Sequence, residues 1–84
     1  MVRENDLVAI FHSIHRVMKA EKVLKAGGAD ILLIPVPRQL TSDCGLALRF
    51  ALTERERVEG LLREANLAPE ELYRKDAKGF EKVF

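Results

Sequence analysis

The chain has 84 residues, 48% of them apolar and 32% charged, and its 14 basic and 13 acidic residues leave a net charge of +1. These values indicate one globular domain, 1–84, and exclude a disordered chain. Balanced charge and few aromatic residues give no argument for nucleic-acid binding. No apolar run reaches the roughly 20 residues of a membrane span, and the charged N-terminus lacks a signal-peptide core. We therefore expect a cytoplasmic protein without membrane contact.

The first half of the chain predicts a strand, a helix and a second strand. Residues 7–11 are a short apolar run typical of a central strand. Ser13 can cap a helix over 14–26, and the glycine pair at 27–28 would end it. Residues 31–36 are a second apolar strand, and the proline near its end suits an edge strand or a strand terminus. The helix would face the core with one apolar stripe: Ile14, Val17, Met18, Ala20 and Leu24.

The second half begins with strict alternation of apolar and other residues over 46–52, which predicts a third strand. The run 53–56, Thr-Glu-Arg-Glu, is a capping-box sequence that would open a helix over 54–65, ended by Asn66. The segment after Asn66 leaves two possibilities. It could form a helical turn, or a fourth strand over 71–75 followed by a turn and a short return over 80–84. We adopt the strand, with a core over 6–76 and a C-terminal tail over 77–84.

The element order is β-α-β-β-α-β. Its simplest packing is a ferredoxin-like α+β sandwich, with two helices on one face of a four-stranded antiparallel sheet. Residues 8–11 and 31–34 of the first two strands are apolar on both faces, yet the helices cover one face only. Either a second subunit or residues 80–84 must cover the other. We expect a homodimer through that face.

Cys44 is the sole cysteine, and it says most about function. One thiol excludes an internal disulfide and a cysteine-based zinc site, and it suits a reducing compartment. Prolines, an arginine, two hydroxyls and an aspartate precede Cys44, and Gly45 follows it, which is typical of a loop that presents a side chain. Cys44 is either a nucleophile held on this loop or a small buried residue.

The expected topology brings the loop close to the first helix. A right-handed crossover makes strands one and two parallel, and strand three lies between them, antiparallel to both. Cys44 should then lie near Phe11, His12 and Ser13, beside the helix N-terminus. The partial positive charge and free N–H groups of that helix N-terminus stabilise a thiolate, and a nearby histidine can add to that effect.

Several blocks of the sequence resemble a family of small bacterial domains described as selenium/sulfur carrier proteins. The matching residues are Phe11-His12-Ser13, Ala20 to Lys25, Ile34 to Arg38 (Ile-Pro-Val-Pro-Arg), and Ser42 to Leu48. The likeness extends to about Asp76. The resemblance implies that Cys44 carries sulfur or selenium as a persulfide or a selenyl sulfide. It also implies a donor protein and an acceptor protein. Such a protein is a carrier rather than a turnover enzyme and needs no cofactor.

The neighbours of Cys44 are candidate binding residues, each with a structural alternative. Arg38 either holds an anion, such as selenophosphate or a partner carboxylate, or is a solvated loop residue. Ser42 and Asp43 either hydrogen-bond a sulfur anion or build a turn, and we favour the turn. Gly45 either lets a partner backbone approach or supplies a positive φ at a strand start. His12 and Ser13 would lie beside the thiol.

The leading function is therefore a sulfur or selenium carrier. The alternative is a non-catalytic ligand-binding, regulatory or dimerisation module in which Cys44 is structural. A metal site using His12 and His15 is not expected, because no carboxylate cluster supports it.

Overall fold

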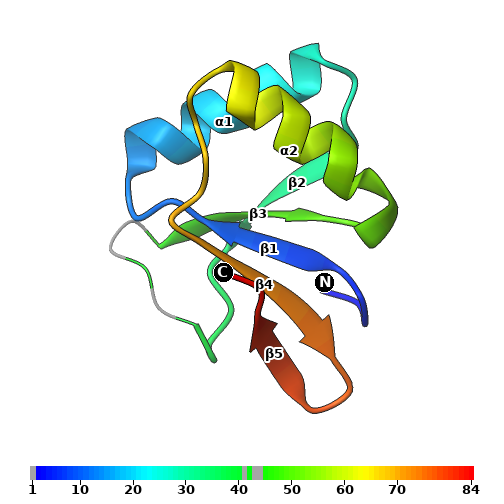
Figure 1. Ribbon diagram of the computed structural model, residues 1–84. Helices are drawn as coiled ribbons and strands as arrows, with labels where there is room; N and C mark the ends of the chain where they lie inside the picture. The colour runs from blue at the N-terminus through cyan, green and yellow to red at the C-terminus, as the bar shows by residue number, and fades with distance from the viewer. Residues whose placement is uncertain (1, 41, 43–44) are drawn as a thin grey trace.

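The computed structural model describes residues 2–40, 42 and 45–84. In this part of the chain, one antiparallel sheet of five strands carries two helices on one of its faces (Figure 1). The elements are β1 (Leu7–Ile10), α1 (Ile14–Ala26), β2 (Ile31–Pro35), β3 (Leu46–Phe50), a 3-10 turn η1 (Leu52–Glu54), α2 (Arg55–Glu64), β4 (Glu71–Asp76) and β5 (Gly79–Lys82). The expected α+β class is confirmed.

The strand order is β2-β3-β1-β4-β5, and every neighbouring pair is antiparallel. The expected sheet of four strands is wrong in its count, because residues 79–82, assigned to a tail, pair with β4 as a fifth strand. Strand β1 is central, and its last residue, Ile10, lies opposite Ala47 of β3 and Glu71 of β4. The ends of three strands therefore meet where β1 leads into α1.

The helix ends follow the capping signals with one exception. Ser13 Oγ accepts a hydrogen bond from the backbone N–H of Arg16 at 3.3 Å, as a helix N-cap does. At the other end of α1, Gly28 takes φ +80° and its N–H donates to Lys25, which satisfies a carbonyl left free by the helix. Asn66 ends α2 in the same left-handed conformation, with φ +58°. The expected capping box is wrong, because α2 starts from η1 at Glu54 and no side chain caps it.

The helices and the sheet enclose the larger core. Val17, Ala20 and Leu24 of α1 and Val58 and Leu62 of α2 are buried in it. They pack on the strand residues Leu7, Ala9, Leu48, Phe50 and Leu72. The expected apolar stripe of α1 is wrong at two positions, because Ile14 and Met18 are 43% and 41% exposed. Ile14 and Met18 lie to one side of the helix face that carries Val17 and Leu24, so their side chains reach the margin of that face rather than the sheet.

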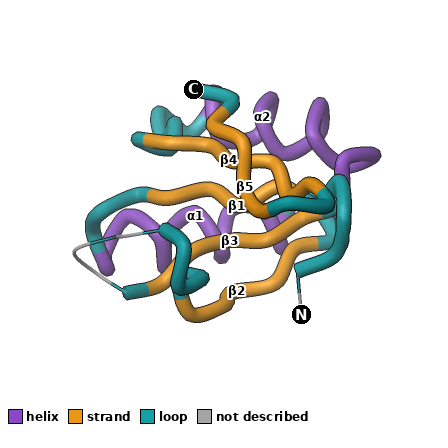
Figure 2. The backbone as a smooth tube through the Cα atoms, turned by 90° about the horizontal axis from the view of Figure 1, so that it is seen from below, coloured by secondary structure: helices purple, strands orange, loops and turns teal. Residues whose placement is uncertain are grey.

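A second, smaller core lies on the face opposite the helices. Its buried members are Val8, Ile10, Ile34 and Ala47, none more than 2% exposed. They are covered by partly buried side chains from separate segments: Val2, Val36, Leu40, Tyr73 and Phe80. Viewed from below, β5 lies in front of β4 and β1, on this face (Figure 2). The argument for a homodimer assumed an open face, and that face is covered within one chain.

No helix in the described residues is long and apolar enough to cross a membrane.

Candidate functional site

The candidate site lies at the end of the sheet where β1 leads into α1. His12 and Ser13 lie in the short connection between β1 and α1, and Gly45 immediately precedes β3. Since Ile10 lies opposite Ala47, Gly45 and His12 both lie just beyond the same end of the β1–β3 ladder. The Val36 N–H donates to the Gly45 carbonyl at 3.0 Å and joins the two ends of the loop. Cys44 and Asp43, two of the expected site residues, lie outside the described residues.

Gly45 has φ +73°, in the left-handed region that favours glycine. Of the two interpretations of this residue, the positive φ at a strand start is the one observed. A Cβ atom added at Gly45 would meet no atom of the described residues within 4 Å, apart from its chain neighbours. Glycine is therefore needed here for its conformation, and the space around it is open.

The other loop candidates are described more simply. Arg38 is exposed, in a turn closed by the Leu40 N–H donating to the Pro37 carbonyl at 2.9 Å. Ser42 is partly buried. Ser13 is used as the N-cap of α1, so its hydroxyl has a structural task. The structure thus brings His12, Ser13 and Gly45 to one end of the sheet.

His12 is held by a hydrogen-bonded cluster that joins β1 to β4. Its Nε2 lies 2.5 Å from Glu71 Oε2, and the Tyr73 hydroxyl donates to Glu71 Oε1, also at 2.5 Å. The His12 and Glu71 side chains are 29% and 23% exposed, so the pair is partly screened by solvent. His12 has φ +55°, an uncommon conformation for a residue with a side chain. The sheet end thus fixes an unusual backbone turn directly before α1.

The cluster shifts the pKa values of two of its members. The Tyr73 hydroxyl, and then His12, hydrogen-bond the Glu71 carboxylate and hold its pKa below the ordinary 4.5, against a smaller opposing effect of burial. The same hydrogen bond raises the pKa of Tyr73 above 10, because ionised Tyr73 would face the Glu71 carboxylate. Glu71 therefore stays ionised as the shared acceptor of both partners.

Sequence reasoning placed His12 near the site but missed Glu71 and Tyr73. A signal was present, because the strand expected at 71–75 begins with a carboxylate and has a phenol two residues later. Residues two apart on a strand lie on the same face. Only the pairing of β4 with β1, in the register that sets Glu71 opposite Ile10, brings this face to His12.

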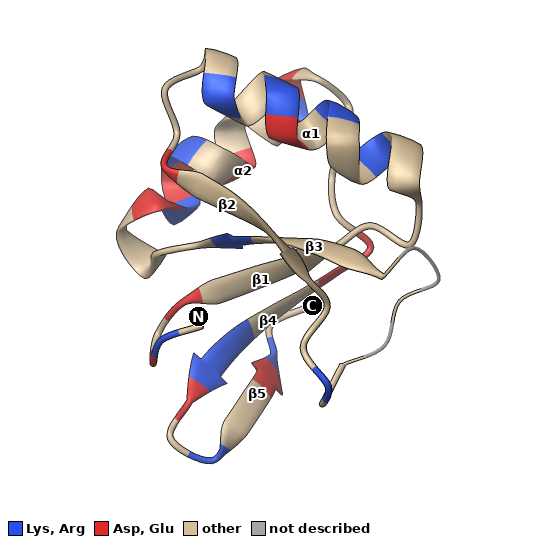
Figure 3. Ribbon diagram, turned by 180° about the vertical axis from the view of Figure 1, so that it is seen from behind, with Lys and Arg blue, Asp and Glu red and all other residues tan. Residues whose placement is uncertain are grey.

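Charge on α1 is unevenly distributed. Its first turn contains no acidic residue, so no carboxylate of that turn itself offsets the positive end of the helix dipole. Farther along, α1 carries Lys19, Lys22 and Lys25, with Glu21 paired to Lys25 at 3.2 Å (Figure 3). The described residues contain no group of three or more potential metal ligands.

Comparison with known proteins assigns the chain to a family. Residues 6–74 match the family described as "Putative Se/S carrier protein-like". A curated relative from Aquifex aeolicus (strain VF5), named "Putative sulfur carrier protein", is 33% identical over 76 residues. The match covers 88% of this chain but only 39% of that relative. No solved structure matches. Because the family match spans β1 through most of β4, the chain belongs to the Se/S carrier protein-like family.

Proposed function

We propose that the protein carries sulfur or selenium on the thiol of Cys44. The observation that carries this proposal is that the chain has one cysteine, and that it falls inside the family match at residues 6–74. Cys44 has the only thiol in this sequence, so a chalcogen that is held on a thiol of this chain must be held there. The relative's name supports sulfur as one cargo, and the family description includes selenium.

The transfer step needs only a thiolate and a donor persulfide. The Cys44 thiolate attacks the outer sulfur of the donor, and a new S–S bond forms at Cys44. The S–S bond of the donor breaks, and its electron pair leaves with the donor thiolate. The proton of the donor persulfide stays on the transferred sulfur or goes to solvent. Release to an acceptor nucleophile reverses this exchange and regenerates the Cys44 thiolate.

The end of the sheet offers a feature that favours an anion near this thiol. Gly45, the next residue in the chain, lies at the same end as the N-terminus of α1, whose first turn has no acidic residue. A helix N-terminus favours an anion nearby. Open space at Gly45 is compatible with the approach of a donor and an acceptor.

His12 has a smaller role in this proposal than its position suggests. Any positive charge on its ring is offset by Glu71, which lies 2.5 Å from Nε2. We therefore assign the stabilisation of the thiolate chiefly to α1. His12 shapes the backbone turn between β1 and α1, and exposed Arg38 is available to an anionic cargo or a partner carboxylate.

Mass spectrometry after incubation with a small-molecule persulfide donor tests the proposal. We expect the wild type to gain the mass of one sulfur atom, on the peptide that contains Cys44, and Cys44→Ser to gain none. The matched control is the double variant Cys44→Ser/Lys78→Cys, which moves the thiol to the exposed turn between β4 and β5.

The proposal expects this displaced thiol to load more slowly at neutral pH, because it lacks the helix N-terminus. Equal loading of the wild type and Cys44→Ser would overturn the proposal. Equally fast loading of the displaced thiol would show that the loop has no special function. The alternative of a binding module with a structural cysteine would then be favoured.

A further inference from the structure

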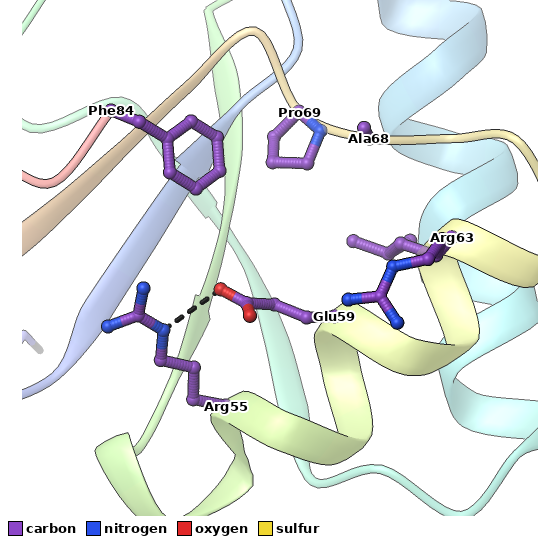
Figure 4. A pocket seen from close by; sticks show the side chains of 7 residues that line it. Arg55, Glu59, Arg63, Ala68, Pro69 and Phe84 are labelled. Atoms are coloured by element: carbon purple, nitrogen blue, oxygen red, sulfur yellow. Dashed lines mark hydrogen bonds and ion pairs between the residues drawn. The ribbon is translucent and has the colours of Figure 1, made fainter.

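A pocket of about 270 Å³ lies between α2, the segment before β4 and Phe84 (Figure 4). Phe84 and Pro69 lie on one side of it, and Arg55 and Glu59 meet on the other. Its lining residues are Arg55, Glu59, Leu62, Arg63, Ala68, Pro69 and Phe84. None of them belongs to the Cys44 loop or to the His12 cluster, so the carrier chemistry leaves this pocket unused.

The charges that line the pocket favour an anion. Arg55 Nε lies 2.9 Å from Glu59 Oε2, and this pair largely cancels its own charge. The guanidinium of Arg63, one helical turn beyond Glu59, makes no hydrogen bond or ion pair within the described part of the chain. A guanidinium without a carboxylate partner presents a planar set of donors that matches a carboxylate. Among the side chains that line the pocket, the Arg63 guanidinium is therefore the one positive charge without a carboxylate partner.

The rest of the lining favours an apolar body attached to that anion. Leu62 forms a buried part of the wall at 2% exposure, whereas the large Phe84 side chain is 48% exposed. Covering half-exposed aromatic surface is favourable at roughly 25 cal/mol per Å² of apolar area. The volume is just below the range of about 300–1,000 Å³ for sites of drug-sized ligands, so the occupant is smaller than those.

We propose that this pocket binds a small monocarboxylate with an aromatic or branched apolar body. The carboxylate pairs with Arg63, and the apolar body lies between Leu62, Pro69 and Phe84. Binding here is independent of Cys44, so the two proposals fail separately.

Titration of the ¹⁵N-labelled protein with three matched probes tests this site. The probes are phenylacetate, its neutral amide phenylacetamide, and acetate, which carries the charge without the ring. We expect phenylacetate to give saturable shifts of the Leu62, Ala68 and Phe84 amide signals, with the β2 amides unchanged. We expect phenylacetamide and acetate to bind at least tenfold more weakly. Equal binding by either of these probes, or no saturable shift with phenylacetate, would overturn the proposal.

Two variants separate the site from a general attraction of anions. Arg63→Gln should weaken phenylacetate binding about tenfold or more, the effect of losing one charge-assisted hydrogen bond. Arg57→Gln on the same helix, whose guanidinium contacts the Gly28 carbonyl outside the pocket, should leave binding unchanged. An equal loss in both variants would show non-specific attraction to α2 and would contradict the assignment to Arg63. Cys44→Ser should bind phenylacetate as the wild type does.

Discussion

The two faces of the sheet are both buried, but by different means. On one face, two helices cover Leu7 and Phe50 with apolar residues repeated at helical spacing. On the other, single side chains from the N-terminus, the loop after β2 and the β4–β5 hairpin cover Val8 and Ile10. The comparison shows that a strand apolar on both sides does not require a second subunit. Short segments from distant parts of the chain can bury it.

The largest expected loss of stability follows from a substitution on the face of the sheet that the helices cover. Phe50→Ala removes a ring that is 1% exposed and should lower the free energy of unfolding by about 3–5 kcal/mol. Leu52→Ala, at an exposed position in η1, is the control and should cost far less. Urea unfolding followed by circular dichroism measures both. Similar midpoints for the two variants would contradict the packing described for this face.

A substitution on the opposite face should lower the free energy of unfolding almost as much, if one chain buries this face. Ile10→Ala, at a site with 0% exposure, should lower the free energy of unfolding by about 2–5 kcal/mol. Because the covering residues belong to the same chain, the loss should not change with protein concentration. A stability that rises with concentration would show that a second copy contributes to this face, as a homodimer would.

Truncating a side chain that covers the smaller core should lower the free energy of unfolding less than truncating a residue buried beneath it. Phe80 is partly buried on the smaller core, and Lys75 Nζ lies 5.8 Å from its ring centre. Phe80→Ala should cost about 1–2 kcal/mol, roughly half the value of a fully buried side chain with a small cation–π contribution. It should also expose apolar surface near Val8 and Ile10. Sedimentation should show more self-association in this variant, and unchanged sedimentation would argue that β5 does not shield the face.

The smallest expected effect concerns the cluster that joins the covered face to the candidate site. Tyr73→Phe removes the main cause of the lowered Glu71 pKa and should cost about 1 kcal/mol at neutral pH. In the wild type, ionised Glu71 stabilises the fold fully above pH 4.5, and this contribution is lost as the pH falls below that value. Tyr73 contributes below pH 10 and loses its contribution as the pH rises above 10.

Tyr73→Phe should therefore flatten the stability profile at both ends. Denaturant unfolding across this pH range measures the profile. A variant whose losses below pH 4.5 and above pH 10 match those of the wild type would contradict the cluster. Lys78→Gln, in the β4–β5 turn, is a control outside the cluster.

The helix-covered face was predictable because its signals are periodic. The alternation predicted a strand over 46–52, and β3 forms as far as Phe50, before η1 begins at Leu52. The spacing of Val58 and Leu62 corresponds to the buried side of α2. The cover of the opposite face was predictable only as one of two alternatives, residues 80–84 or a second subunit, because Val2, Leu40 and Phe80 share no period and meet only after the chain has folded. For the same reason β5 was assigned to a tail. It is short, and it pairs only with the outer edge of β4.

The candidate site was predictable only in part. The topological argument places Cys44 near Phe11, His12 and Ser13, and Cys44 itself lies outside the described residues. The structure places Gly45, the next residue, at the same end of the sheet as His12 and Ser13. The positive φ of His12 and its contact with Glu71 depend on the β1–β4 register, which no local pattern contains. The ambiguity of Gly45 had to be resolved by the structure, because one residue type serves both a close approach and a positive φ.

Release of the cargo tests the central claim most directly, because a carrier must yield what it holds. The wild type, loaded by a persulfide donor and freed of excess donor, is treated with cyanide. Cyanide attacks the outer sulfur, the S–S bond breaks, and thiocyanate forms as the Cys44 thiolate leaves. The account predicts thiocyanate in a one-to-one ratio to loaded protein, return of the chain to its original mass, and no thiocyanate from Cys44→Ser. Thiocyanate in equal amounts from both proteins, or loaded sulfur that cyanide cannot remove, would contradict it.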